Sequence, residues 1–195
     1  TEHAGHLPEI QPGLYLGSKE AMYDDEWMQR AGITTILSCV EQGQLNPPTY
    51  PDRYHVVKLN LSDNMDACLE AEYPQCAEVI RGCRYGQGRV LVHCNAGRSR
   101  SASIVMMYAM AEARFSLRSA YQLANRARRG IILPNMGFQM QLCEFELALT
   151  GGGVNSLPHF AGAVQAGRAR RGPQAVAPEW VEPGAWTPAV DAVAG

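Results

Sequence analysis

The sequence predicts an α/β fold in which a central, mostly parallel sheet is covered by helices on both faces. Short apolar runs rich in β-branched residues alternate along the chain with segments that repeat apolar residues at helical spacing. Glycine and proline stand at most of the junctions between these segments. The 195 residues, 46% of them hydrophobic and 18% charged, are enough for one domain with a sizeable core.

The first part of the chain is expected to hold two strands with a helix between them. Residues 14–17 (LYLG) predict a short edge strand, and Ser18 is a suitable N-cap for an amphipathic helix over 19–31. Gly32 is well placed to end that helix. Residues 33–39 (ITTILSC) are β-branched and apolar, as expected of a buried strand.

The middle of the chain continues the alternation of strand and helix. Residues 42–51 contain glycine, asparagine and three prolines and predict a loop, after which residues 54–61 resume as a strand. Apolar residues at helical spacing predict a helix over 69–85. The fully apolar run 90–92 predicts a short buried strand, and a long apolar helix is expected over 100–113.

Two capped helices and a tail complete the chain. Ser116 is expected to cap a helix that ends near Gly130, and Asn135 to cap a last helix that runs to about Thr150. Beyond residues 151–153 the chain is rich in glycine, alanine and proline, which predicts a flexible tail. The expected division is a flexible N-terminus at 1–8, one folded domain at 9–150 and the tail at 151–195.

Charge and cysteine content narrow the classes of function and the cellular setting. A formal net charge of −2 gives no global basic field, so nucleic acid is not expected as a partner. None of the six cysteines falls in a CxxC pair, so no structural zinc site is expected. We also expect no other metal and no cofactor. No secretory signal and no apolar run of membrane-spanning length is visible. We therefore expect a reducing intracellular setting, cytoplasmic or nuclear or both.

The stretch from Val90 to Ser101 (VLVHCNAGRSRS) is the most informative part of the sequence. A buried strand ends at His93, and a short loop turns directly into a helix. Successive backbone N–H groups of such a loop point inward and form an anion-binding nest, to which the helix N-terminus adds free donors and its positive dipole end. Gly97 allows a backbone conformation that a side chain would obstruct.

Two side chains give this nest its predicted chemistry. The field that binds a phosphate dianion at the nest also favours a thiolate at Cys94, which makes it a nucleophile. The planar guanidinium of Arg100 can grip two phosphate oxygens, and that grip tightens as the phosphoryl group flattens in the transition state. The alternative is a buried structural cysteine beside a solvated basic turn, but the strand, loop and helix context favours the chemical interpretation.

His93 and Cys94, five further residues, and then Arg100 and Ser101 form the HC-x5-R-S signature. With it the chain resembles the dual-specificity branch of the protein tyrosine phosphatase superfamily. The resemblance extends to three other segments and covers about residues 8 to 150. These segments are 12–18 (PGLYLGS), 32–37 (GITTIL) and 134–142 (PNMGFQMQL).

The resemblance implies a phosphatase that needs no metal and forms a phosphocysteine on Cys94, which water then hydrolyses. The family's general acid is an aspartate on a loop after the preceding strand. Asp63 fits that place, with Asp66 as a competitor on the same loop. The phosphate loop would consist of Asn95, Ala96, Gly97, Arg98, Ser99 and Arg100.

Further residues receive supporting roles from the same resemblance. Ser101 would hydrogen-bond the Cys94 sulfur and ease its departure in the second step. His93 would orient the loop, or is simply a satisfied buried histidine. Asn135 would support the phosphate loop by hydrogen bonds, or serves as the N-cap of the last helix.

Arg98 and Cys39 each lead to a separate hypothesis. Arg98 either adds positive charge at the pocket mouth, which favours strongly acidic substrates, or is an exposed arginine without effect on selectivity. Cys39 ends a central strand, where strand C-termini gather near the active-site crevice. It either forms a protective disulfide with Cys94 on oxidation, as in some relatives, or is a packed free cysteine.

Three functions therefore compete. The leading one is hydrolysis of phosphoserine, phosphothreonine and phosphotyrosine in phosphorylated protein partners. The second keeps the same site but acts on a non-protein phosphate such as a phosphoinositide, a glucan or an RNA end. The third is a phosphate-binding pseudoenzyme or scaffold, for which nothing in the site argues because Cys94, Arg100 and Asp63 are all present.

Overall fold

Eleven helices and strands make up the described part of the chain, which comprises residues 9–44, 53–153, 156–157 and 160 of a computed structural model. The strands are β1 (Glu9–Gln11), β2 (Leu14–Gly17), β3 (Thr35–Val40), β4 (His55–Asn60) and β5 (Val90–His93). The helices are α1 (Lys19–Tyr23), α2 (Asp25–Ala31), α3 (Leu69–Tyr85), α4 (Arg100–Ala113), α5 (Leu117–Ala127) and α6 (Met136–Leu149).

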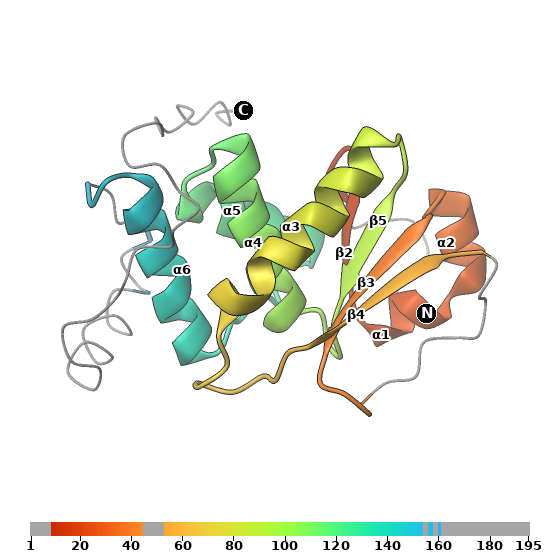
Figure 1. Ribbon diagram of the computed structural model, residues 1–195, viewed down its shortest axis with the longest axis horizontal. Helices are drawn as coiled ribbons and strands as arrows, with labels where there is room; N and C mark the ends of the chain where they lie inside the picture. The colour runs from red at the N-terminus through yellow and green to blue at the C-terminus, as the bar shows by residue number, and fades with distance from the viewer. Residues whose placement is uncertain (1–8, 45–52, 154–155, 158–159, 161–195) are drawn as a thin grey trace.

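The strands form one sheet in the order β1-β2-β5-β3-β4, in which only β1 runs antiparallel to its neighbour. Helices α1 and α2 lie on one face, and α3 to α6 lie on the other (Figure 1). The predicted α/β fold with its mostly parallel, doubly covered sheet is thus confirmed. No helix within the described residues is both long enough and apolar enough to cross a bilayer.

The apolar sequences of β3 and β5 suit their positions inside the sheet. Every residue of β3 and of β5 is buried, as expected of parallel strands covered on both faces. Helix α4 is buried from Arg100 to Met110 and lies at the centre of the larger core, between the sheet and the other helices of that face. The smaller core, under α1 and α2, includes Tyr15 and Trp27, whose rings meet edge to face.

Three details differ from the sequence prediction. Strand β2 is not at the edge of the sheet, because Gly13 adopts a left-handed φ of +78° and turns β1 back onto it. The helix expected over 19–31 is divided in two, because the Asp24 side chain accepts a hydrogen bond from Trp27 N and starts α2. Ser18 precedes α1 without a side-chain capping bond, whereas Gly32, at a φ of +68°, ends α2 as predicted.

Packing also continues beyond the domain boundary expected at residue 150. Leu157 and Phe160 are buried, and the Phe160 ring packs edge to face against Tyr121. The buried Glu146 carboxylate accepts hydrogen bonds from the backbone N–H and the hydroxyl of Ser156. The expected boundary at residue 150 thus leaves out positions that pack against the domain, and the division into a domain and a flexible tail stays a prediction. The expected flexible segment 1–8 and the other tail residues from 154 on lie outside the described residues.

Glu146 allows a test of this packing. The same carboxylate also accepts a 2.7 Å hydrogen bond from Leu117 N, so Glu146→Ala leaves three donors without their acceptor. We expect this substitution to lower the free energy of unfolding by about 2–4 kcal/mol, measured by urea denaturation. The matched control is Glu144→Ala, on a less buried position of the same helix, which should change it by less than about 1 kcal/mol. Equal losses in both variants would contradict the assigned role of Glu146.

Candidate active site

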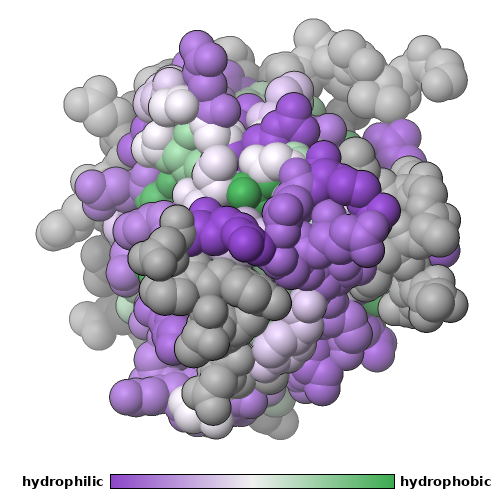
Figure 2. All heavy atoms as spheres, turned by 90° about the vertical axis from the view of Figure 1, so that its right-hand side faces the viewer, coloured by the Kyte–Doolittle hydropathy of each residue, from purple (hydrophilic) through white to green (hydrophobic). Residues whose placement is uncertain are grey.

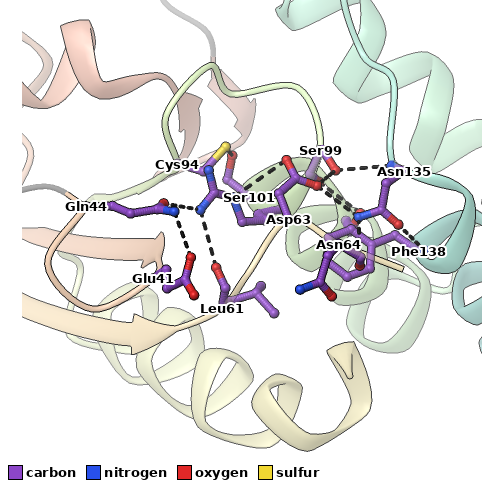
Figure 3. Close-up of polar contacts among 12 residues, drawn as sticks. Glu41, Gln44, Leu61, Asp63, Asn64, Cys94, Ser99, Ser101, Asn135 and Phe138 are labelled. Carbon is purple, nitrogen blue, oxygen red and sulfur yellow. Dashed lines mark hydrogen bonds and ion pairs between the residues drawn. The ribbon is translucent and has the colours of Figure 1, made fainter. Parts of the chain in front are cut away.

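The candidate site lies where β5 ends and α4 begins. Ser38 of β3 is in register with His93 of β5, so the loop of residues 94–99 emerges at the carboxyl edge of the parallel strands. Cys94 is the first residue of this loop and is only 2% exposed. Figure 3 shows its sulfur beside Ser101, with Asp63 and Gln44 approaching the same place from other elements.

Neighbouring segments hold this loop with its carbonyl groups pointing outward and its N–H groups pointing inward. The carbonyls of Asn95, Ala96 and Arg98 accept hydrogen bonds from Lys19 N, Arg128 Nη2 and Leu133 N at 3.0, 3.1 and 3.0 Å. In a planar trans peptide the next N–H points the opposite way, so these N–H groups face the loop interior. Gly97 N accordingly donates to Cys94 Sγ at 3.2 Å. We call these inward-facing N–H groups the nest, because they are arranged as in anion-binding loops, and binding of phosphate there stays a prediction.

Gly97 is required by both conformation and space. Its φ is +66°, and a Cβ at this position would lie 2.5 Å from the carbonyl oxygen of Gly17. A side chain would have to displace the backbone of β2, which cannot move without disturbing the sheet. The close contact between the loop and β2 thus fixes the shape of the nest.

The Cys94 sulfur has two donors and the start of a helix around it. Besides Gly97 N, Ser101 Oγ lies 3.2 Å from Sγ and is fully buried in the first turn of α4. The N-terminus of α4 adds its partial positive charge. An anionic sulfur at Cys94 would be stabilised by all three features.

Arg100 is held at the end of the loop with part of its guanidinium still unused. Nη1 donates to Gln44 Oε1 at 2.8 Å and to the Leu61 carbonyl at 3.3 Å. Nε is buried, lacks a hydrogen-bond partner among the described residues, and lies 3.7 Å from Asp63 Oδ2. Gln44 in turn donates to Glu41 at 2.8 Å. Sequence reasoning missed Gln44, since it stands in a loop without a local motif.

Asp63 reaches the loop, and Asp66 does not. Asp63 Oδ1 accepts hydrogen bonds from Ser99 Oγ at 2.7 Å and Asn135 Nδ2 at 2.9 Å (Figure 3). Asp66 is exposed, and only its backbone N–H, which donates to Asn64 Oδ1, makes a hydrogen bond within the described structure. The contact of Asp63 with the Ser99 hydroxyl could not be foreseen from sequence spacing.

Asn135 joins three parts of the site. Its Oδ1 accepts from Phe138 N at 3.0 Å, so it is the N-cap of α6. Its Nδ2 donates to Asp63, and its backbone N–H donates to Ser99 Oγ at 3.2 Å. The backbone of Asn135 therefore contacts the loop of residues 94–99, while its side chain contacts Asp63.

His93 is neutral and fully buried. Its Nδ1 lies 3.2 Å from the Cys94 carbonyl oxygen, and its Nε2 has no partner among the described residues. Burial lowers the pKa of His93 to about 4, and the Arg100 charge acts in the same direction, against the hydrogen bond to the Cys94 carbonyl.

Cys39 and Arg98 each lie next to the nest. Cys39 follows Ser38, just as Cys94 follows the register partner His93, so the two cysteines are neighbours across adjacent strands. Burial raises the pKa of the Cys39 thiol, and its pairing with Cys94 on oxidation stays a prediction. Arg98 is exposed, and its Nε donates to the Ile131 carbonyl at 3.1 Å.

Comparison with known proteins agrees with this geometry. Residues 14–148 match the family model described as dual specificity phosphatase, catalytic domain. The chain belongs to this family. It is 35% identical over 138 residues to mouse dual specificity protein phosphatase 2, a match that covers 71% of this chain and 42% of the mouse protein. The chain thus spans less than half the length of that relative.

Two solved structures of the family show the same fold. Human DUSP28 superposes with a TM-score of 0.66 at 30% identity, covering 72% of this chain and 93% of that one. The human tyrosine phosphatase-like serine/threonine/tyrosine-interacting protein gives 0.65 at 34% identity, covering 71% and 93%. Both structures thus share the architecture of this chain.

The buried His93 of this family member predicts a pH-dependent stability. The unfolded chain takes up a proton near pH 6.5 and the folded chain only near pH 4, so stability is full above pH 6.5 and is lost as the pH falls between these values. Between pH 6.5 and about pH 5 the loss amounts to about 2 kcal/mol. In His93→Gln, the free energy of unfolding should fall by about 2 kcal/mol less than in wild type between pH 6.5 and pH 5. Urea denaturation at several pH values measures this slope of the unfolding free energy against pH.

The control for this measurement is His55→Gln, which replaces an exposed histidine on β4. It should keep the slope of the wild-type protein. An unchanged slope in His93→Gln would mean that the pKa of His93 is the same in the folded and the unfolded protein.

Proposed function

We propose that this chain is a dual-specificity protein phosphatase that hydrolyses phosphoserine, phosphothreonine and phosphotyrosine through a phosphocysteine on Cys94. The observation that carries the proposal is the convergence of a nucleophilic sulfur, an inward-facing nest of N–H groups and an unused Arg100 Nε at one place. Each of these features is complementary to a phosphoryl group rather than to a neutral substrate.

In the first step, the Cys94 sulfur attacks phosphorus and the bond to the leaving oxygen breaks. The nest and the Arg100 guanidinium bind the three non-bridging oxygens, where negative charge is spread in the transition state. Asp63 gives its proton to the leaving oxygen, which departs as the free hydroxyl of serine, threonine or tyrosine. Its position 3.7 Å from Arg100 Nε supports this role, since that guanidinium edge would hold the phosphate.

In the second step, water attacks the phosphocysteine and Asp63 takes up its proton. The phosphorus–sulfur bond breaks, inorganic phosphate forms and Cys94 leaves as a thiolate. The Ser101 hydroxyl, at 3.2 Å from the sulfur, stabilises the charge that develops there. The same carboxyl group thus serves as acid and then as base.

Two other functions rest on weaker support. A non-protein phosphate was suggested by the charge of Arg98, but its Nε is tied to the Ile131 carbonyl beside the loop. A pseudoenzyme would have the family's fold without a working site. The contacts among Cys94, Ser101 and Gly97, and between Asp63 and Arg100, support an enzyme instead.

The cysteines support a reducing setting, in the cytoplasm or the nucleus or both. All six are free, and four of them, Cys39, Cys76, Cys94 and Cys143, are buried. A nucleophile that works as a thiolate is readily oxidised, so a reducing compartment preserves it. The partner we propose there is a phosphorylated protein.

Replacing the nucleophile tests the proposed function. We expect Cys94→Ser to lose turnover of p-nitrophenyl phosphate and of phosphopeptides below detection, because the hydroxyl is a far weaker nucleophile. The nest and Arg100 remain, so binding of a phosphotyrosine peptide, measured by calorimetry, should persist. A wild-type protein that binds this peptide but hydrolyses neither substrate would instead indicate a binding role.

Asp63 and Asp66 lie on the segment 61–68 between β4 and α3, which we call the acid loop, and they form a matched pair for a test. We expect Asp63→Asn to lower kcat by about 100-fold on phosphoserine peptides, whose leaving oxygen needs a proton, and by much less on an aryl phosphate with an acidic leaving group. Asp66→Asn should leave both rates within about twofold of wild type. Steady-state kinetics on the two substrates checks this. The opposite outcome would assign the acid to Asp66.

A further inference from the structure

Large apolar side chains gather beside the nest. Within the described residues, six large hydrophobic side chains are substantially exposed, and four of them border the site. We call these four the apolar rim. They are Met65, Ile131, Leu133 and Met136, which are 41, 41, 59 and 47% exposed.

Backbone contacts fix the rim to the site. Leu133 N donates to the Arg98 carbonyl at 3.0 Å, and the Ile131 carbonyl accepts from Arg98 Nε at 3.1 Å. Met65 lies on the acid loop, and its backbone packs against Gly137, where an added Cβ would clash with it. Gly137 follows Met136, so this contact places Met65 beside the start of α6.

The exposure of Ile131 and Leu133 is built into the chain that carries them. Between them Ile132 is buried, and its N–H and carbonyl bond to Asn125 Oδ1 and the Tyr121 hydroxyl. A buried residue of this segment thus stands between two exposed ones. Because Ile132 anchors the segment, its two neighbours are held outward as a fixed apolar surface.

Other parts of the surface do not share this character. The described residues on the side of α1 and α2 are mostly hydrophilic, with a small apolar patch (Figure 2). The remaining exposed large hydrophobics are Tyr23 on α1 and Tyr85, the last residue of α3. The C-terminal end of α3 lies opposite the segment that joins β4 to α3 (Figure 1). Clustering at the site therefore distinguishes the rim from ordinary surface residues.

We propose that the apolar rim binds the substrate's polypeptide, so that the protein prefers phosphoproteins with a large apolar residue next to the phosphorylated one. The inference rests on the proposed function, because the phosphate in the nest places the flanking residues over the rim. Arg98, which forms no ion pair among the described residues, stands between the nest and the rim. An acidic bilayer is the less suitable occupant, since the chain has a formal net charge of −2.

The test compares two phosphotyrosine peptides that differ only in leucine or serine beside the phosphotyrosine, with p-nitrophenyl phosphate as a small ester that cannot reach the rim. We expect wild type to prefer the leucine peptide by roughly tenfold in kcat/KM. In Ile131→Ser/Leu133→Ser, the ratio of leucine-peptide to small-ester kcat/KM should fall by about the same factor. Both residues are exposed, so the fold should tolerate the change.

The control is Tyr85→Ser, which removes the most exposed large hydrophobic side chain, 80% exposed and away from the site, and should keep the wild-type ratio. Equal rates of wild type on the two peptides, or an unchanged ratio in the double variant, would overturn the proposal that the rim binds the substrate's polypeptide. The proposal would also fail if the double variant lost activity only on phosphoinositide in anionic vesicles, since the rim would then bind a membrane. If wild type does not hydrolyse the small ester, the proposed function itself fails, and the rim with it.

Discussion

The site depends on one constraint: the backbone of residues 94–99 must keep its carbonyl groups outward. A short loop has no partners of its own for these carbonyls, so α1, the end of α5 and the segment before α6 supply them. Gly97, pressed against β2, allows the turn. The fold therefore turns the N–H groups of this loop inward, and in our proposal they bind the phosphate.

Asp63, to which we assign the proton transfers, is positioned mainly by neutral partners. Its closest partners are the neutral Ser99 hydroxyl and Asn135 amide, while Arg100 stands further off at 3.7 Å. Those partners come from the phosphate loop and from the N-cap of α6. The acid loop is therefore aligned with the nest by the same contacts that begin a helix.

Much of this arrangement can be predicted from sequence, because periodic apolar segments and the HC-x5-R-S stretch carry local information. Helix α3 and the nest are examples. The contacts that the sequence did not reveal are long-range. Gln44 reaches Arg100 across 56 positions, and Ser99 reaches Asp63 across 36. The burial of Leu157 and Phe160 is not predictable from composition either, because composition describes the average of a segment and not two side chains that pack into a core.

In our proposals, chemistry and selectivity use different residues that are joined by backbone hydrogen bonds. The nest binds through the backbone, whose geometry tolerates few substitutions, as the left-handed Gly97 illustrates. The apolar rim presents side chains from the segment whose backbone supports the nest, since Leu133 N holds the Arg98 carbonyl. A substitution at Leu133 keeps that hydrogen bond and changes only the surface. Such a division lets substrate preference vary between relatives while the phosphate site, one hydrogen bond away, keeps its shape.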